Sequence, residues 1–541
     1  MGSMKTPGVY IIEKNAFPNS VVEAPTAIPA FIGYTERAVN GNDDLTNVPW
    51  KISSMTEYIQ YFGGGPDLKF EVDIKDGSLC IEGKNSYTLY YNMMLFFANG
   101  GGACYIVSVG SYKDALKKDS MITGLGKLTL EQEITLVAIP EAVNLSSSEE
   151  FKDIQQQMLS HCGNTMKNRF ALLDIYPKAN EKTKIEDQVN FFCDNIGSSF
   201  LSYGAAYFPW LNTSIVGERD LKGDMFTWTD NAYIHRTQLD AGFAEIVESL
   251  FVEEFEIKEN VVKNGHTFKL EEVVEGDIYA DSDTEKTNVI GRIESIKDIK
   301  EAGNEKVIKK NVKVVWLFPN NVDKQALHQA LYNVSSVYKQ AIKGVLKNLN
   351  LFPPSAAMAG IYTMVDNSRG VWKAPANVTL NYVGSTVEDI DDEQQADLNT
   401  PTHGKAVNVI RLFRGEGVKV WGARTLDGNS LDWRYVNVRR TLLFLEESIK
   451  NAARAYVFEP NDAGTWINMK CMIDSFLRSV WKRGGLAGAT PEDAFEVHIG
   501  LGDTMTAEDI LDGIMRITVL VAVTHPAEFI EITFQQQAQK S

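Results

Sequence analysis

The 541-residue sequence has few cysteines and no close pair of them. Five cysteines are scattered along the chain, an odd number with no CxxC spacing: Cys80, Cys104, Cys162, Cys193 and Cys471. A disulfide framework needs an even, clustered set, and a structural zinc site needs closely spaced ligand pairs. The sequence therefore predicts a reduced protein with neither feature.

Residue patterns typical of catalysis are equally scarce. The seven histidines include no HxxxH pair, and the chain contains no GxSxG motif. The glycine pairs at 124–126 and 415–417 lack the spacing of phosphate-binding or dinucleotide-binding loops, so we expect turns. The acidic run at 389–393 lacks the calcium-loop rhythm and is better explained as a solvated loop. We predict no catalytic residue, no cofactor and no metal site, and a structural role in place of an enzymatic one.

Positive charge and long apolar runs are also missing. The 53 Lys and Arg residues face 71 Asp and Glu residues, which gives a net charge of −18. A chain this acidic lacks the basic excess that neutralises phosphates, so nucleic acid is a poor partner. The longest apolar stretch, residues 517–523, is far below the ~20 residues of a membrane helix, so we expect no membrane insertion.

What is present is an alternation of apolar strands and amphipathic helices from about residue 100 to residue 210. Apolar runs at 104–109, 134–139, 170–175 and 205–208 read as buried strands, with helices expected after Ser146–Ser148 and near 184–197. This alternation predicts an α/β domain with a parallel sheet covered on both faces. An earlier strand is expected at 30–32, followed by a loop-rich stretch over 36–100, and the rhythm is expected to resume with the apolar run 314–318 and one helix over 324–347.

Two segments depart from that rhythm. Between Phe251 and Asn311, 25 of 61 residues are charged and short alternating pieces occur, which predicts a small exposed β-rich insertion or, alternatively, a solvated loop without function. In the last third we expect a helix near 442–453, a second one capped by Asn461 or Asp462 and ended by Gly484-Gly485, and a short helix after Thr490-Pro491. Strands are expected to follow at 495–499 and 517–523. We interpret this part as an α+β domain. Its crowded arginines at 411–440 are expected to pair with Asp427, Asp432, Glu446 or Glu447.

Both ends of the chain carry strand patterns without a local partner. Near the start these residues are Val9, Tyr10, Ile11 and Ile12. Near the end, after Phe529, the residues Ile530, Ile532 and Phe534 alternate with polar residues. Unpaired strand edges must be covered. From the residues alone, docking in the same subunit and addition to a neighbour's sheet are equally acceptable.

Several sequence blocks resemble the signature of contractile tail sheath proteins, which build contractile phage tails and bacterial contractile injection systems. The blocks are residues 6–10, 353–362, 366–377, 420–426, 433–440, 458–462 and 526–529, in the family's order. The residues that carry the resemblance are Pro353, Pro354, Gly360, Asp366, Arg369, Gly370, Trp372, Trp421, Arg424, Arg439, Glu459, Pro460, Asn461 and Asp462.

The resemblance implies an N-terminal arm (1–27), a subtilisin-like sheath domain (28–385, with insertions at about 36–100 and 212–312), a C-terminal sheath domain (386–525) and a C-terminal arm (526–541). It also implies that the arms complete the C-terminal domain of neighbouring subunits. Expected partners are further copies in hexameric rings and a helical sheath, an inner tube, a baseplate and a tail terminator. The particle would assemble in the bacterial cytoplasm and contract to drive the tube through an envelope.

Two expectations remain, one on the surface that faces the tube and one on the alternative functions. Glu492 and Asp493 are our candidates for the tube-facing surface, because a surface that must release its partner should be polar. The alternatives are a subtilisin-like or other α/β hydrolase, for which the search found no triad, and another self-assembling shell protein.

Overall fold

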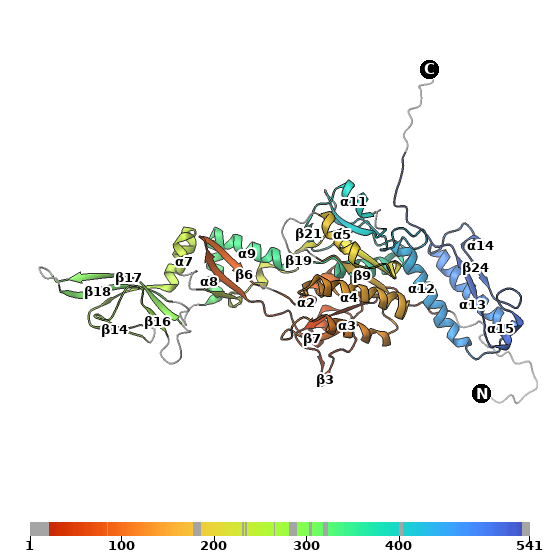
Figure 1. Cartoon of the computed structure of the whole chain (residues 1–541), viewed down its shortest axis with the longest axis horizontal. Helices are drawn as coiled ribbons and strands as arrows, with labels where there is room; N and C mark the ends of the chain where they lie inside the picture. The colour runs from red at the N-terminus through yellow and green to blue at the C-terminus, as the bar shows by residue number, and fades with distance from the viewer. Residues whose placement is uncertain are drawn as a thin grey trace, which may run out of the picture. The chain divides into compact units, whose positions relative to one another are not determined.

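The structure is a computed structural model that describes residues 21–83, 85–176, 185–229, 232, 235–263, 266–280, 289–301, 306–316, 323–399 and 404–532. The chain folds into two compact units. The first, here called the body, comprises Met1–Gly65, Tyr87–Asn212 and Phe352–Ser541. The second, here called the insertion unit, comprises Pro66–Ser86 and Thr213–Leu351. Figure 1 shows the elements of both.

A nine-stranded sheet forms the centre of the body, in the order β20-β23-β22-β10-β9-β8-β1-β7-β4. Its inner strands, from β22 to β7, run parallel, and the outer ones are antiparallel. The strands are β1 (Pro29–Thr35), β4 (Trp50–Ile52), β7 (Cys104–Ser111), β8 (Leu136–Ala138), β9 (Phe170–Asp174), β10 (Gly204–Phe208), β20 (Val378–Thr379), β22 (Val407–Phe413) and β23 (Gly417–Val420). The predicted parallel α/β sheet is confirmed.

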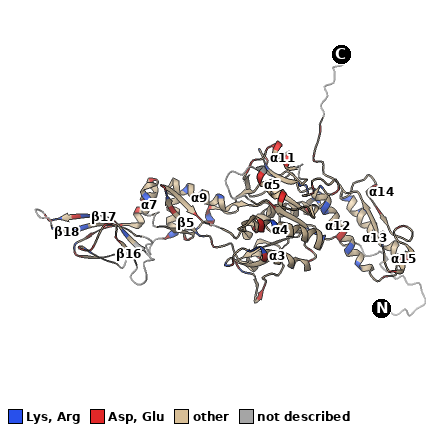
Figure 2. Cartoon of the chain, in the orientation of Figure 1, with Lys and Arg blue, Asp and Glu red and all other residues tan. Residues whose placement is uncertain are grey.

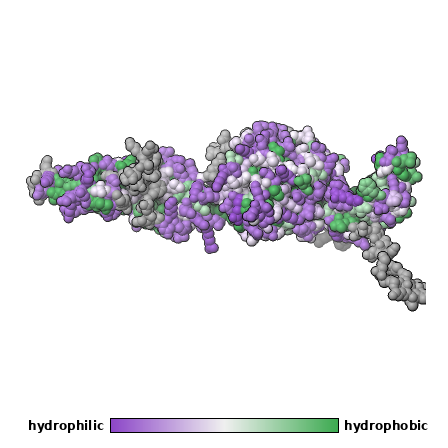
Figure 3. Space-filling model, turned by 90° about the horizontal axis from the view of Figure 1, so that it is seen from below, coloured by the Kyte–Doolittle hydropathy of each residue, from purple (hydrophilic) through white to green (hydrophobic). Residues whose placement is uncertain are grey.

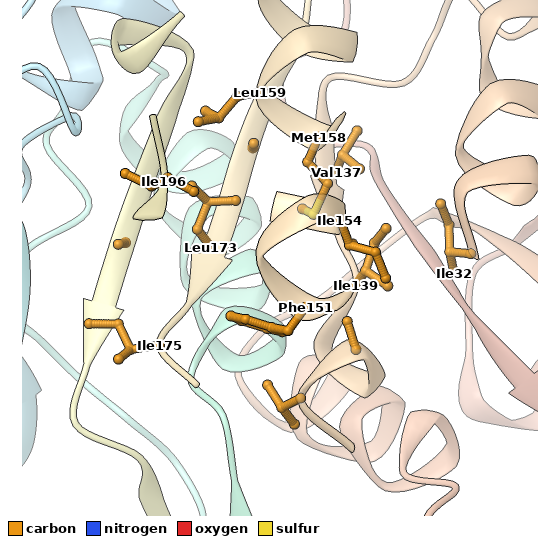
Figure 4. Packing of buried hydrophobic residues seen from close by; sticks show 14 of the residues in the cluster. Ile32, Val137, Ile139, Phe151, Ile154, Met158, Leu159, Leu173, Ile175 and Ile196 are labelled. Atoms are coloured by element: carbon orange, nitrogen blue, oxygen red, sulfur yellow. The ribbon is translucent and has the colours of Figure 1, made fainter. Parts of the chain in front are cut away.

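Helices cover both faces of this sheet because its strands are apolar on both sides. One face carries α3 (Lys118–Lys127), α4 (Ser148–Ser160) and α5 (Ile185–Asn195), whose buried side chains share a core with Ile32, Val137 and Leu173 (Figure 4). The other face carries α2 (Leu89–Ala98) and α10 (Ser355–Arg369), where Phe96 contacts Phe31 and Tyr362 contacts Phe170. Two shorter helices, α1 (Met55–Phe62) and α11 (Asp392–Asn399), complete this layer structure.

The last part of the body has a core of its own. Helices α12 (Val436–Ala453) and α13 (Ala463–Lys482) pack with the hairpin of β24 (Phe495–His498) and β25 (Thr518–Val521) around Phe444, Ile473 and Val497. Two short helices, α14 (Pro491–Ala494) and α15 (Ala507–Leu511), flank the hairpin. We call residues 436–523 the C-terminal region.

The insertion unit contains a four-stranded antiparallel sheet in the order β13-β18-β17-β16 and the hairpin β14–β15. These strands are β13 (Val252–Ile257), β14 (Asn260–Lys263), β15 (His266–Lys269), β16 (Ile278–Ala280), β17 (Val289–Lys300) and β18 (Val307–Trp316). The rest of the unit consists of β5 (Phe70–Lys75), β6 (Ser78–Glu82), β12 (Phe226–Trp228), α7 (Ala241–Phe251), α8 (Lys324–Val334) and α9 (Ser336–Leu349). Strands therefore occur where short alternating pieces predicted a β-rich segment.

Four expectations about local structure were wrong. The stretch 36–100 is not loop-rich but contains β4, α1, β5, β6 and α2. The apolar run at 314–316 belongs to β18 of the insertion unit and not to the parallel sheet, because its burial is against Ile257 and Ile293. The helix expected over 324–347 is broken at Ser335, whose extended backbone caps α9. Gly124 and Gly126 lie in α3 and not in a turn.

Gly124 has a packing role in α3. A Cβ atom at this position would lie 2.6 Å from Val109 Cγ1 and 2.9 Å from Ile32 Cγ2. The glycine therefore allows α3 to approach β1 and β7 closely. The second glycine pair, Gly415 and Gly417, forms the turn between β22 and β23 as predicted, with both residues at positive φ.

Candidate assembly site at the roots of the two chain ends

The buried ion pair of Asp366 and Arg440 joins three parts of the body. Arg440 on α12 donates to both carboxylate oxygens of Asp366 on α10, at 2.9 and 2.5 Å. The side chains are only 4% and 1% exposed. Burial alone would lower the pKa of Arg440, but the Asp366 carboxylate holds it above its usual value. Arg440 also donates to the backbone oxygen of Thr26 at 2.8 Å. One guanidinium thus ties the N-terminal chain to both helices.

Residues 23–28, here called the N-terminal strap, are held by further contacts. The Ala24 N–H donates to Ser448 Oγ on α12 at 2.9 Å, and Glu23 forms an ion pair with Arg483. At the other end of the strap, the Ile28 N–H donates to Thr135 Oγ1 at 3.0 Å. The strap is therefore fixed to the C-terminal region at one end and, at the other, to Thr135 just before β8 of the central sheet.

A second anchor holds residues 522–528, here called the C-terminal root. Arg424, 2% exposed, donates to both carboxylate oxygens of Glu528, and Tyr435 donates to the same group at 3.1 Å. Burial opposes ionisation of Glu528, but the hydrogen bonds from Arg424 and Asn399 lower its pKa below the usual value. Asn437 on α12 donates to the Thr524 oxygen at 3.0 Å. Helix α12 thus contacts the roots of both chain ends.

Beyond the root, the described chain is exposed and has no strand. Phe529, Ile530 and Ile532 are 69–78% exposed, and residues 529–532 have no regular structure. Residues 529–532 therefore form no strand within this chain, and a strand at 529–534 that forms on pairing with a neighbouring subunit stays a prediction. Phe534 and the run Val9, Tyr10, Ile11 and Ile12 lie outside the described residues.

The hairpin β24–β25 offers edges that a strand could use. It is a two-stranded sheet among the described residues, so each strand has an edge to which no further described strand is paired. Leu520 on β25 is half exposed. Open edges of this kind are sites for β-augmentation.

Some of the signature residues meet at these anchors. Asp366 and Arg424 make the two ion pairs described above. Trp372 lies against the positive-φ residue Gly370, and its backbone oxygen accepts from Asn437 at 2.9 Å. Arg439 lies between two aromatic rings, 3.9 Å from the centre of Tyr203 and 4.5 Å from that of Trp433. Asp366, Trp372 and Arg424 therefore lie where the central sheet and its helices join the segments that lead to the chain ends.

The other signature residues have separate places. Pro353 and Pro354 precede α10, and Arg369 lies in its last turn. Gly360 lets α10 approach α2, since a Cβ would lie 2.6 Å from the Phe96 oxygen. Trp421 is partly exposed beside Phe413, and Glu459, Pro460, Asn461 and Asp462 form the loop before α13.

Ser355 begins α10 and is hydrogen-bonded to Asp174. Its N–H donates to Asp174 Oδ1 at 2.9 Å and its hydroxyl donates to Asp174 Oδ2 at 2.5 Å. Both residues are buried, and burial raises the pKa of Asp174 to about 7. Among the described residues no hydrogen bond joins Ser355 to an imidazole, so Ser355 and Asp174 do not form a Ser-His-Asp triad there.

Within the subunit, three of the arginines of 411–440 form ion pairs with carboxylates that were not among those expected, while the expected pairing between subunits stays a prediction. Arg411 pairs with Asp392, Arg424 with Glu528 and Arg440 with Asp366. The expected partners Asp427, Asp432, Glu446 and Glu447 were chosen for their proximity in sequence, whereas the two buried pairs span 104 and 74 residues. Sequence reasoning missed Glu528, Thr26 and Tyr207, whose hydroxyl bonds Tyr362 at 2.7 Å.

Of the two tube-facing candidates, one has a local structural role. Asp493 accepts from the Thr490 N–H and hydroxyl at 3.2 and 2.9 Å and so caps α14. Glu492 is exposed. Only Glu492 can be changed without disturbing the cap.

Neither a membrane-spanning helix nor a metal-binding cluster occurs among the described residues. Among them, no helix combines the length and apolarity needed to cross a membrane. Nor do they contain three His, Cys, Asp or Glu side chains grouped to hold a metal ion.

The comparisons with known proteins agree on one class. A family described as "Phage tail sheath C-terminal domain" matches residues 429–537, which include the C-terminal region and its root. The tail sheath protein of Vibrio phage KVP40 is 25% identical over 134 residues, and the major tail sheath protein of Serratia phage KSP20 is 26% identical over 138 residues. These matches cover 25% and 26% of this chain, but only 20% and 35% of the relatives.

Solved structures match over almost the whole chain. The sheath of an extracellular contractile injection system, the PVC sheath complex in its contracted state, is 25% identical with a TM-score of 0.54, over 99% of both chains. The contracted helical sheath of the anti-feeding prophage has the same fold, with 24% identity and a TM-score of 0.56 over 99% of this chain and 100% of that one. The chain is therefore similar to tail sheath proteins, through the family match at residues 429–537 and through the fold over almost its whole length.

Proposed function

We propose that the chain is the structural subunit of a contractile sheath, which polymerises as stacked hexameric rings around an inner tube and contracts to drive that tube through a target envelope. The family and the sheath assemblies of its structural relatives support this proposal. The role is structural and not enzymatic. In it, the body has the family's subtilisin-like fold, and baseplate and terminator proteins close the two ends of the polymer.

The observation that carries the proposal is the anchoring of both chain ends on α12. A subunit linked to its neighbours through terminal strands must resist tension at the points where those strands leave the body. Buried, bidentate Arg–carboxylate pairs are suited to this, because breaking one leaves an uncompensated buried charge. The pairs Arg440–Asp366 and Arg424–Glu528 lie at the two exits.

In this proposal the strands 9–12 and 529–534 add to the open edges of a neighbour's β24–β25 hairpin. Each added strand would contribute several backbone hydrogen bonds, at about 0.5–1.5 kcal/mol apiece, and the burial of Phe529, Ile530 and Ile532. In a free subunit the exposed residues 529–532 gain neither. The links would persist through contraction because backbone pairing does not depend on side-chain sorting.

A pair of truncations tests this mechanism by electron microscopy of the purified chain. Ending the chain after Glu528 keeps the Arg424 ion pair but removes the strand, so we expect a folded subunit that forms no tubes or rings. Ending it after Pro526 also removes Glu528, and the buried Arg424 should then destabilise the fold by about 3–5 kcal/mol. Long tubes from the first variant would refute the role of the C-terminal strand.

A further inference from the structure

The loop between α12 and α13 presents an aromatic side chain to solvent from an unfavourable backbone conformation. Phe458 is fully exposed and has φ of 72°, in the left-handed region. For a residue with a Cβ atom this region costs roughly 1–2 kcal/mol. Within the subunit no burial of the ring offsets that cost. Such strain concentrates where a side chain must be presented for a contact.

The loop is held rigid by its neighbours. Asn461 donates to the Ile514 oxygen at 3.1 Å and accepts from Trp466 Nε1 at 2.7 Å. Asp462 caps α13 by accepting from the Thr465 N–H at 3.0 Å. A preorganised loop loses little conformational entropy when it binds, so Phe458 has the properties of an interface anchor.

The loop and the turn after α15 form one apolar surface with a negatively charged border. The Asn461–Ile514 bond brings these two segments together. We call the exposed residues Val457, Phe458, Leu511 and Ile514 the apolar knob, of which Leu511 is 87% exposed. Figure 3 shows hydrophobic surface at the end of the C-terminal region near α15. We call the exposed carboxylates of the same two segments the acidic rim: Glu459, Asp462, Glu508 and Asp512.

The outer face of α13 has the opposite charge. The buried face is formed by Met469, Ile473, Phe476 and Val480, so the residues opposite them face solvent. There lie Lys470, Arg478 and Lys482, which we call the basic row, with Asp474 between the first two. Ile467 and Cys471 are exposed on the same face and supply apolar surface among these charges.

We infer that the apolar knob and acidic rim of one copy bind the basic row of a second copy, in a head-to-tail contact. Asp462 and Arg478 are 16 residues apart along α13, about 24 Å, so this part of the rim and the row cannot pair within one copy. Copies with a net charge of −18 repel one another unless unlike surfaces are matched, and these two surfaces are complementary in charge. Head-to-tail contacts between identical subunits generate rings or open helices. This inference rests on the proposed self-assembly and names the surfaces that carry it.

Charge reversal with rescue tests the contact. The rim variant carries Glu459→Lys and Asp512→Lys, and the row variant carries Lys470→Glu and Arg478→Glu. Asp462 stays unchanged because it caps α13. Each variant alone places like charges together, so the sedimentable polymer should fall at least about tenfold in either. The chain with all four changes should polymerise again, because the charges are matched once more. Circular dichroism checks that each variant is folded.

A separate variant tests the knob without changing its charge. Phe458→Gly removes the anchor and the backbone strain together, so the subunit should be about as stable as the wild type, yet polymerise at least about tenfold less. Full polymerisation of this variant, or failure of the fourfold variant to recover, would overturn the inference. Failure of the wild-type chain to polymerise would instead contradict the proposed function.

Discussion

The insertion unit and the C-terminal region differ in how they treat buried charge. In the insertion unit, Arg236 is buried and pairs with Glu248 and Glu294, and Lys313 contacts the same two carboxylates. These acidic side chains are 42% and 32% exposed, and opposite charges lie together along β17 and β18 (Figure 2). At the C-terminal region, by contrast, Arg440 pairs with Asp366 and Arg424 pairs with Glu528, whose side chains are 1% and 21% exposed, and these pairs hold segments that continue into the chain ends.

Ion pairs built on a buried arginine can therefore serve different purposes in the two regions. The pairs of the insertion unit join elements of the same small unit, whose core is closed by Ile257, Phe268, Val314 and Trp316. The pairs at Arg440 and Arg424 fix a strap and a root that lead to exposed apolar residues and open strand edges. We therefore assign stability to the former and transmission of force between subunits to the latter.

Replacing Arg440 and, separately, Arg236 should give the largest difference in the free energy of unfolding between the two regions. Arg440→Met leaves Asp366 buried without a partner and should cost about 3–5 kcal/mol in the free energy of unfolding. Arg236→Met leaves carboxylates that water can reach, so about 1–2 kcal/mol is expected. Urea titrations measure both losses. Equal losses would contradict the distinction.

The same two variants should also differ in assembly. Under conditions where both are folded, Arg440→Met should release the strap, which native-state proteolysis would detect between residues 21 and 28, and should reduce polymerisation. Arg236→Met should polymerise like the wild type. Tubes of normal length from a folded Arg440→Met subunit would show that the N-terminal strap does not transmit force between subunits.

Deleting the insertion sheet should leave assembly intact. Replacement of Val252–Trp316 by a short Gly/Ser linker removes the whole closed core. A cut at Asn311 would leave Val312, Val314 and Trp316 of β18 exposed. We expect a folded subunit that still forms tubes in electron micrographs, since this sheet has its own core. Loss of all tubes would show that the insertion holds the lattice.

A smaller effect, on the pH dependence of stability, is expected at Asp174, the buried carboxyl group that accepts hydrogen bonds from Ser355 at the start of α10. Because burial raises the pKa of Asp174 to about 7, the folded state keeps a proton that the unfolded chain releases near pH 4. Its contribution to stability is present below about pH 4 and is lost as the pH rises to about 7, by up to about 1.4 kcal/mol per pH unit. Asp174→Asn should abolish this dependence, so the variant's deficit should shrink with rising pH in urea titrations. A constant deficit across that range would contradict the assignment.

The smallest effect is expected at the tube-facing candidate. Glu492→Lys changes one exposed charge and preserves the Asp493 cap. If α14 faces the tube, assembly around the tube should become more sensitive to salt, while tube-free sheath polymers persist. Unchanged co-assembly over a salt series would place the tube contact elsewhere.

The sequence allowed prediction of the sheet but not of the anchors, for physical reasons. Strands such as 104–109 and 170–175 are apolar on both faces except at Ser108 and Asp174, a pattern typical of a sheet covered on both faces. Helix α2 was missed because Leu89–Ala98 is apolar on nearly all sides and lacks a polar face to give it a helical period. The pair Arg424–Glu528 joins residues 104 positions apart, and nothing local in the sequence indicates such a partner.

The central claim is that the chain ends link neighbouring subunits through the β24–β25 hairpin. Electron cryomicroscopy of the assembled polymer tests it directly. The account predicts that residues 9–12 and 529–534 form strands added to the hairpins of other subunits, with Arg440–Asp366 and Arg424–Glu528 intact at both exits. Terminal strands paired with the hairpin of their own subunit would contradict it.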